Sequence, residues 1–268
     1  MYMVLEDEFG DVIQKARQGL GLNEKELAEK IGLKEQDIKD IETYKLKPED
    51  KVDILAKTLN LHKKKLLIIM KEEFNPQPKI EDDDFEVFVV TSEFPSNAYI
   101  IADKKTKECI VIDTAGDPGL VQDKVDENKL KPLAILLTHS HSDHIEGVKA
   151  LERVFEVQSY IYPSRLYSSE GTIDLKDNQT LEFSKFNIKI LFTPGHTQDS
   201  CCFLINDLCF TGDTIFAGSI GRPNWGHEIL IDAIEKKIFT LDNEVILLPG
   251  HGPITTVVEE KNNNPFFQ

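Results

Sequence analysis

The apolar residues change their spacing part-way along the chain. Between Val12 and Met70 they recur at helical spacing without strand-like alternation, which predicts a small all-helical domain over residues 1–72. After Phe85 the pattern becomes short apolar runs interleaved with helical periodicity. Such alternation is typical of α/β organisation. The sequence therefore predicts two domains of different class.

The helical domain carries its own start and stop signals. Asn23 is placed to cap a helix, Glu26 completes a capping box with it, and Gly32 ends that helix. Two short helices joined through residues 31–33 form a helix-turn-helix hairpin. The predicted helices cover about residues 11–20, 23–31 and 34–42, with a fourth after Pro48.

A linker separates the two domains at residues 73–84. This stretch has two prolines at alternate positions and then a run of carboxylates, which opposes helix and favours an extended, solvated segment. The second domain then spans residues 85–268. Its predicted strands are FEVFVV, AYIIAD, CIVIDT and LAILLT, and its predicted helices include about residues 119–128 and 145–155.

Composition narrows the class of protein. The 268 residues include 47 acidic and 31 basic ones, a net charge of -16, which argues against a generic nucleic-acid or anionic-membrane binder. No apolar run approaches the roughly 20 residues that span a bilayer, so no membrane partner is expected. The start MYMVLEDEFG lacks the features of a secretory signal, and the 4 cysteines suit a reducing compartment. We therefore expect a globular cytoplasmic protein, and a homo-oligomer stays open.

The histidines point to metal chemistry. Of 7 in the chain, His139, His141 and His144 fall within the stretch HSHSDH. An extended chain leaving the strand LAILLT would point His139 and His141 to one side, whereas Asp143 and His144 begin the next helix and face elsewhere. One loop can thus serve two metal ions. Imidazole and carboxylate ligands suit zinc, and also iron or manganese.

Three further donors share one local design, in which an apolar strand and a tight glycine turn precede the ligand. The segments are KILFTPG before His196, LCFTG before Asp213 and VILLPG before His251. Loops beyond strand ends are where sites assemble in α/β sheets. Each turn alone would be ordinary turn chemistry, but together with HSHSDH they indicate a metal site. The candidate ligands are His139, His141, Asp143, His144, His196, Asp213 and His251.

These motifs resemble those of the metallo-β-lactamase-fold hydrolases. The resemblance covers about residues 85–268 and rests on THSHSDH, TPGHT, TGDTIF, GSIGR, PGHGP and the ending EKNNNPF, with an order and spacing most similar to the short glyoxalase II-like branch. It implies an αββα sandwich with two divalent ions, zinc before iron or manganese. It makes Asp143 and Asp213 the catalytic carboxylates, both as ligands. By the same resemblance, one ion is expected to be held by His139, His141 and His196 and the other by Asp143, His144 and His251, with Asp213 bridging them.

The resemblance also implies hydrolysis of a thioester such as S-lactoylglutathione. Two divalent ions that share a water lower its pKa toward neutrality, and the resulting hydroxide attacks an acyl carbon. A thiolate, with a pKa of about 8.5, leaves with little need for a general acid. Relatives cleave lactones, β-lactams or phosphodiesters, and some use one iron ion to oxidise glutathione persulfide. An iron-dependent persulfide dioxygenase is therefore an alternative to the thioester hydrolase.

The loop GSIGRPNWGHE supplies the substrate-binding candidates. Arg222 could pair with a substrate carboxylate and Trp225 could wall the pocket, and a structural arginine with a packed aromatic is an equal alternative. His227 of the same loop is the third candidate. Thr138 and Thr197 flank ligands and could orient them.

Three residues outside the ligand set have structural interpretations. Cys201 and Cys202 follow the TPGHT turn in the alternating segment SCCFLIND, which predicts at least one buried strand residue. His62 stands beside the basic run Lys63 to Lys65 at a helix start. We expect it to be a solvated surface residue.

The first 70 residues resemble the phage-repressor-type helix-turn-helix family, through GLNEKELAEKIGLKEQDIKDIE and LAKTLNLHKKKLL. The resemblance implies DNA binding, with Lys34, Gln36 and Lys39 as contacts. Residues 1–72 carry 14 basic and 15 acidic side chains, so the basic excess of a phosphate-contacting module is missing. A docking or dimerisation module is the alternative, and a transcription regulator that senses a metabolite through its metal domain is a further hypothesis.

Overall fold

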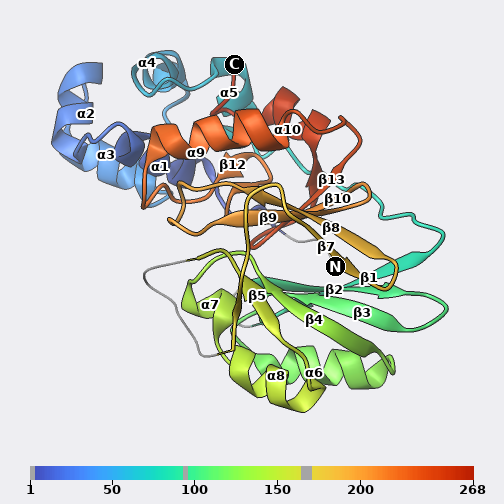
Figure 1. Ribbon diagram of the computed structural model, residues 1–268. Coiled ribbons are helices and arrows are strands. Elements are labelled where there is room, and N and C mark those ends of the chain that lie inside the picture. Colours follow the sequence, from blue (N-terminus) through green and yellow to red (C-terminus); the bar gives the residue numbers. More distant parts are fainter. Residues whose placement is uncertain (1–3, 93–95, 164–170) are drawn as a thin grey trace.

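The computed structural model describes residues 4–92, 96–163 and 171–268. Two six-stranded sheets lie face to face, and helices cover both outer faces (Figure 1). The αββα architecture expected from the sequence is confirmed. The strand orders are β1-β2-β3-β4-β5-β6 in the first sheet and β14-β13-β10-β9-β8-β7 in the second.

The first sheet is antiparallel over β1 to β3 and parallel from β3 to β6. Parallel neighbours need crossover connections, and helices α6 and α8 pack their apolar residues on the outer face of this sheet. The strands are β1 (Phe85–Thr91), β2 (Asn97–Asp103), β3 (Glu108–Ile112), β4 (Lys131–Leu137), β5 (Ser159–Ile161) and β6 (Ile173–Asp174). The helices are α6 (Pro118–Glu127), α7 (Ser142–Ile145) and α8 (Val148–Phe155).

The second sheet faces the first across a core that includes Phe186, Phe203 and Phe210. Its strands are β7 (Thr180–Phe183), β8 (Phe186–Phe192), β9 (Cys201–Ile205), β10 (Leu208–Gly212), β13 (Ile246–Pro249) and β14 (Thr255–Thr256). A small hairpin, β11 (Ile215–Phe216) and β12 (Ser219–Ile220), follows β10. Helix α9 (His227–Ala233), its π-helical continuation η2 (Ile234–Ile238) and α10 (Val257–Asn263) cover the outer face.

The N-terminal segment is helical, as the apolar spacing predicts. Asn23 accepts from the Glu26 N–H at 2.9 Å, the capping box is formed, and Gly32 takes the left-handed conformation at φ 71° that ends the helix. The helices are α1 (Phe9–Gly19), α2 (Glu24–Ile31), α3 (Glu35–Glu42), η1 (Glu49–Lys51), α4 (Val52–Thr58) and α5 (Lys63–Met70).

The helical segment packs on the outer face of the second sheet, where α1 lies beside α9 (Figure 1). Phe9 and Leu66 belong to one continuous apolar core with Leu230, Ile234 and Phe267. The two parts of the chain therefore share a core. None of the helices in the described ranges is long and apolar enough to cross a membrane.

His62 differs from its expected role. It is half-buried, its backbone N–H donates to Pro265 O at 2.7 Å, and it occupies the N-cap position of α5. The C-terminal residues pack against the N-terminal end of α5. Buried Lys65 of this helix donates hydrogen bonds to the carbonyl oxygens of Lys261 and Phe267. The basic run Lys63 to Lys65 does not by itself predict that the C-terminal residues pack here. Cys201 and Cys202 are both buried, as expected.

Candidate metal centre

Strand ends deliver the candidate ligands to one edge of the sandwich. His139 follows β4, His196 lies between β8 and β9, Asp213 follows β10, and His251 follows β13. Strand β9 is antiparallel to β8 and to β10, and β10 is parallel to β13. The carboxyl ends of β8, β10 and β13 therefore meet at the same edge.

Two glycine positions allow this close approach. Gly212, at φ 47°, turns the chain immediately before Asp213. A Cβ on Gly250 would lie 2.3 Å from Asp213 Oδ1 and 2.6 Å from His144 Cε1, so only glycine fits there. The glycine turns noticed in the sequence are thus required by the packing of the site.

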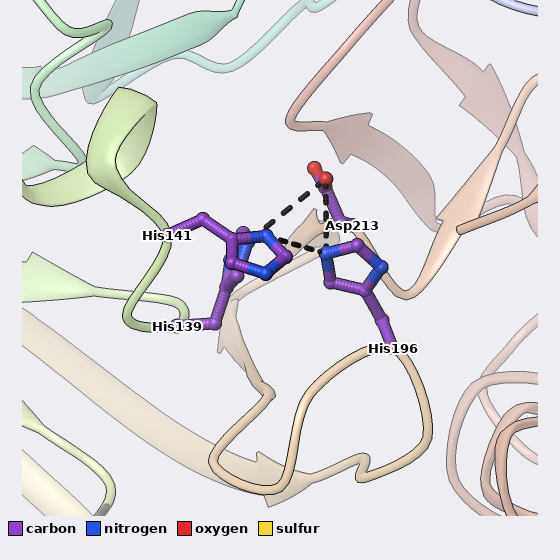
Figure 2. Close-up of side chains that lie close together, drawn as sticks. All are labelled: His139, His141, His196 and Asp213. Carbon is purple, nitrogen blue, oxygen red and sulfur yellow. Dashed lines mark hydrogen bonds and ion pairs between the residues drawn. The ribbon is translucent and has the colours of Figure 1, made fainter. Parts of the chain in front are cut away.

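The first donor group consists of His139, His141, His196 and Asp213, whose ligand atoms lie within 4.8 Å of one another. Figure 2 shows the three rings and the carboxylate converging. His141 Nδ1 is 3.0 Å from His139 Nε2 and 2.9 Å from His196 Nε2. Asp213 Oδ2 is 3.3 Å from His196 Nε2.

The second donor group consists of Asp143, His144 and His251. Asp143 Oδ2 is 3.3 Å from His251 Nε2 and 3.5 Å from His144 Nε2. Asp213 reaches this group too, with Oδ1 3.4 Å from His144 Nε2 and Oδ2 3.6 Å from His251 Nε2. The structure therefore brings all seven sequence-predicted donors together, with Asp213 between the two groups.

Hydrogen bonds on the far side of three rings fix their tautomers. His196 Nδ1 is 2.8 Å from the carbonyl oxygen of Arg222, which can only accept, so Nδ1 carries the proton. His144 Nδ1 likewise faces Asp113 Oδ2 at 2.8 Å. The Thr138 hydroxyl donates to Asp113, so it accepts from His139 Nδ1 at 3.1 Å. In the neutral form of each ring, Nε2 therefore turns a lone pair toward the centre.

This arrangement fits a divalent metal. Imidazole lone pairs that face one another and a carboxylate repel unless a cation lies between them. His144 Nε2 and Asp213 Oδ1 are buried and have no hydrogen-bond partner among the described residues, as expected for atoms whose partner is an ion. Nitrogen and carboxylate donors of this kind suit zinc and iron.

Burial and the nearby carboxylates control the ionisation of three histidines of the two donor groups. Burial lowers the pKa of His196 to about 4 and that of His139 well below its usual range, although the Asp213 carboxylate opposes both shifts. Both rings are therefore neutral near pH 7, which is the form that binds metal. For His144, burial opposes the charged form, but the carboxylates of Asp213 and Asp113 outweigh it and raise the pKa.

The other candidates lie around this edge. The Arg222 guanidinium donates to Gln14 Oε1 at 3.2 Å and to Gln18 Oε1 at 3.3 Å, both on α1. The Trp225 side chain is exposed, and its backbone N–H donates to Gly195 O at 2.9 Å. His227 is half-buried beside Gly19 of α1. Their binding of substrate stays a prediction.

The two threonines beside the ligands differ in their contacts. The Thr138 hydroxyl bridges His139 and Asp113. Thr197 instead bonds Ser200 within its own turn, through its backbone N–H at 3.1 Å and its hydroxyl at 2.7 Å. Of the two, only Thr138 contacts a ring in the position that orients it.

Two residues of the site were missed by sequence reasoning. Asp113 accepts from Thr138 N, Thr138 Oγ1 and His144 Nδ1. It ends the segment CIVID, an apolar strand that leads to a donor without a glycine turn, as LAILLT leads to His139, and so could have been found. Glu6 has its Oε2 3.9 Å from His251 Nδ1, and no pattern in the sequence indicates that contact.

Fold and site together define a metal-dependent enzyme of the αββα class. Comparison with protein families gives a match of residues 91–251 to the Metallo-beta-lactamase superfamily. The chain belongs to this superfamily and is one of its metallo-hydrolases. Residues 2–47 match a transcription regulator-like HTH domain.

Individual relatives agree with this placement. The chain is 30% identical over 216 residues to the hydroxyacylglutathione hydrolase GloC of Haemophilus influenzae, covering 69% of this chain and 98% of GloC. The crystal structure of the B3 metallo-beta-lactamase BLEG-1 matches with a TM-score of 0.62 at 30% identity, covering 68% of this chain and 100% of that one. That of TTHA1623 in a di-iron-bound form matches with a TM-score of 0.60 at 27% identity, covering 67% and 100%.

Proposed function

We propose that this chain is a dinuclear metallohydrolase that cleaves a thioester in the cytoplasm. The observation that carries the proposal is the pair of donor groups joined by the Asp213 carboxylate. The thioester class is supported by the similarity to GloC, which extends over 98% of that enzyme. Zinc is the proposed metal because neutral imidazoles dominate the donor set.

The chain's own residues would hold the metal ions and orient the side chains that bind them. His139, His141 and His196 would hold one ion and Asp143, His144 and His251 the other, with the Asp213 carboxylate lying between the two groups. When bound, the ions activate water and act as Lewis acids toward the acyl oxygen. Asp113 and the Arg222 carbonyl keep His144 and His196 in the ligating tautomer. The exposed ring of Trp225 is the proposed wall for the substrate.

Metal analysis coupled to a substrate screen tests the proposal. We expect two metal ions per chain and turnover of thioesters above that of lactones and β-lactams. His139→Ala and Asp213→Ala should lose metal and at least about a hundredfold of the turnover, since each removes a direct ligand. His62→Ala, which changes a histidine outside the site, is the matched control. Folded His139→Ala and Asp213→Ala proteins with full metal and activity would show that the assignment is wrong.

An iron-dependent persulfide dioxygenase is the alternative function for the same set of donors. The similarity to a di-iron form of TTHA1623 makes iron a realistic occupant. A persulfide dioxygenase would hold one iron ion and consume oxygen when given glutathione persulfide. Two zinc ions per chain without oxygen consumption would eliminate it.

DNA binding is a second candidate function, favoured by the helix-turn-helix match. Lys34, Gln36 and Lys39 are exposed on or beside α3, but Lys39 pairs with Glu35 and Gln36 donates to Asp40. Fluorescence anisotropy with duplex DNA at two salt concentrations tests this role. Binding that weakens with salt and is lost in a Lys34→Ala/Lys39→Ala protein would support it, and absent binding at low salt would reject it.

A further inference from the structure

The segment before α1 reaches the metal centre from outside the sandwich. Lys15 of α1 is buried, pairs with Asp7, and donates to the carbonyl oxygen of Ile220 at 2.7 Å. Its ammonium lies 4.7 Å from the centre of the Phe216 ring. Because a buried cation needs all of its partners, these contacts fix the chain at Asp7 against the β11–β12 hairpin.

Glu6 is thereby held at the rim of the second donor group. A Cβ on Gly252 would lie 2.9 Å from Glu6 N, so the two backbones are in close contact. Glu6 Oε2 is 3.9 Å from His251 Nδ1, and the Glu6 side chain keeps 31% of its surface exposed. A molecule that approaches the centre from this side therefore meets a carboxylate supplied by the helical segment.

The cations around the hairpin are already engaged. Lys15 is paired with Asp7, and the Arg222 guanidinium is bonded to Gln14 and Gln18. Residues 73–268 add 17 basic against 32 acidic side chains. A substrate anion next to Glu6 would be repelled at short range, and neither Lys15 nor the Arg222 guanidinium is free to offset that repulsion. The repulsion would therefore oppose the attraction that bound metal ions exert on the same anion.

We propose that Glu6 is a specificity-determining residue that excludes acyl substrates bearing a negative charge beside the reacting group. The site then takes thioesters whose thiol part is neutral or cationic. This inference rests on the hydrolase function proposed above, and it gives the helical segment a part in substrate selection.

Three small thiols of similar length test the inference: thiocholine (cationic, with a quaternary ammonium that cannot accept the acyl group), N-acetylcysteamine (neutral) and 3-mercaptopropionate (anionic). Their S-acetyl esters are compared by kcat/KM, and the free thiols by calorimetric binding to the metal-loaded protein. Burial raises the pKa of Glu6, so the measurements are made on the alkaline side of neutrality, at pH 8. We expect the order cationic, neutral, anionic in the wild-type protein.

Glu6→Gln should lower the preference for the cationic over the anionic compound by about tenfold, both in kcat/KM of the esters and in the affinity for the free thiols. The change should be smaller at high salt. Glu29→Gln, which removes an exposed charge from the same segment, should leave this preference unchanged. An unchanged preference in Glu6→Gln, or tighter binding of the anionic thiol by wild type, would overturn the inference. If no thioester is cleaved, the proposed function fails, but the thiol binding still decides the role of Glu6.

Discussion

Asp113 shows how one carboxylate can prepare a metal site without touching the ion. Its three acceptor contacts hold the end of β4 through Thr138 and orient the ring of His144. Because these contacts place a proton on His144 Nδ1, they leave Nε2 free to bind metal.

Asp113→Asn should weaken metal binding. The new amide nitrogen would take the place of Oδ2, because a nitrogen in the place of Oδ1 would set two donors, the amide and the Thr138 N–H, against each other. In the place of Oδ2, the amide nitrogen would donate a hydrogen bond toward His144 Nδ1. The ring must accept there and move its proton to Nε2, which removes a ligand. We expect metal affinity to fall about 10- to 100-fold, measured by competition with a chromophoric chelator. Asp103→Asn, at a buried carboxylate bonded to Lys105 N and Thr106 N, should keep the wild-type affinity; equal loss in both would contradict the argument.

The ligands could be predicted because each sits at a strand end with a local signature. Asp113 also ends an apolar strand, but no glycine turn precedes it, and the segment CIVIDT has the pattern of a strand throughout. Glu6 could not be predicted, since its contact with His251 depends on how α1 docks on the hairpin, and apolar spacing does not encode that docking. The same holds for Arg222, whose side chain turns to two glutamines on α1.

At the level of elements, α1 joins the helical segment to the sandwich through a polar contact inside an apolar core. Lys15 and Asp7 both have side chains only 6% exposed, and Phe9, Val12 and Ile13 of the same helix are buried in the apolar core. Burying two charges is costly, so the contact depends on both partners being present. Lys15 also donates to the carbonyl oxygen of Ile220 in the hairpin, and this bond specifies one docking position for α1, which an apolar face alone would define less sharply.

Lys15→Met should destabilise the protein strongly, because it leaves the Asp7 carboxylate buried without its cation. We expect a loss of about 3–5 kcal/mol in the free energy of unfolding, measured by urea denaturation. Lys15→Met/Asp7→Leu should recover part of that loss. The exposed pair Lys47 and Glu72, with side chains 35% and 73% exposed, is the control, and its coupling should be below about 1 kcal/mol. A Lys15–Asp7 coupling as small as that would refute the interpretation.

At the scale of the whole molecule, the helical segment and the sandwich share one core, which runs from α1 and α5 to α9, η2 and the C-terminal phenylalanines. The sequence predicts the two parts and the extended stretch between them, since their periodicities differ. It does not predict how they pack, because apolar residues such as Leu66 and Ile234 look alike whether they face their own domain or a neighbour. Activity and stability should therefore depend on both parts.

Removing residues 1–72 should expose the surface that they cover. Each large apolar side chain returned to water costs about 1.5–3 kcal/mol, and Leu230, Ile234 and Phe267 all lie in the shared core. We expect the remaining chain, 73–268, to bind a hydrophobic dye, to aggregate in size-exclusion chromatography, and to unfold at a lower temperature than the full chain. Supplying residues 1–72 as a separate fragment should reverse part of each change. A monodisperse 73–268 protein with the thermal midpoint of the full chain would mean that the helices are a detachable module and that the shared core contributes little.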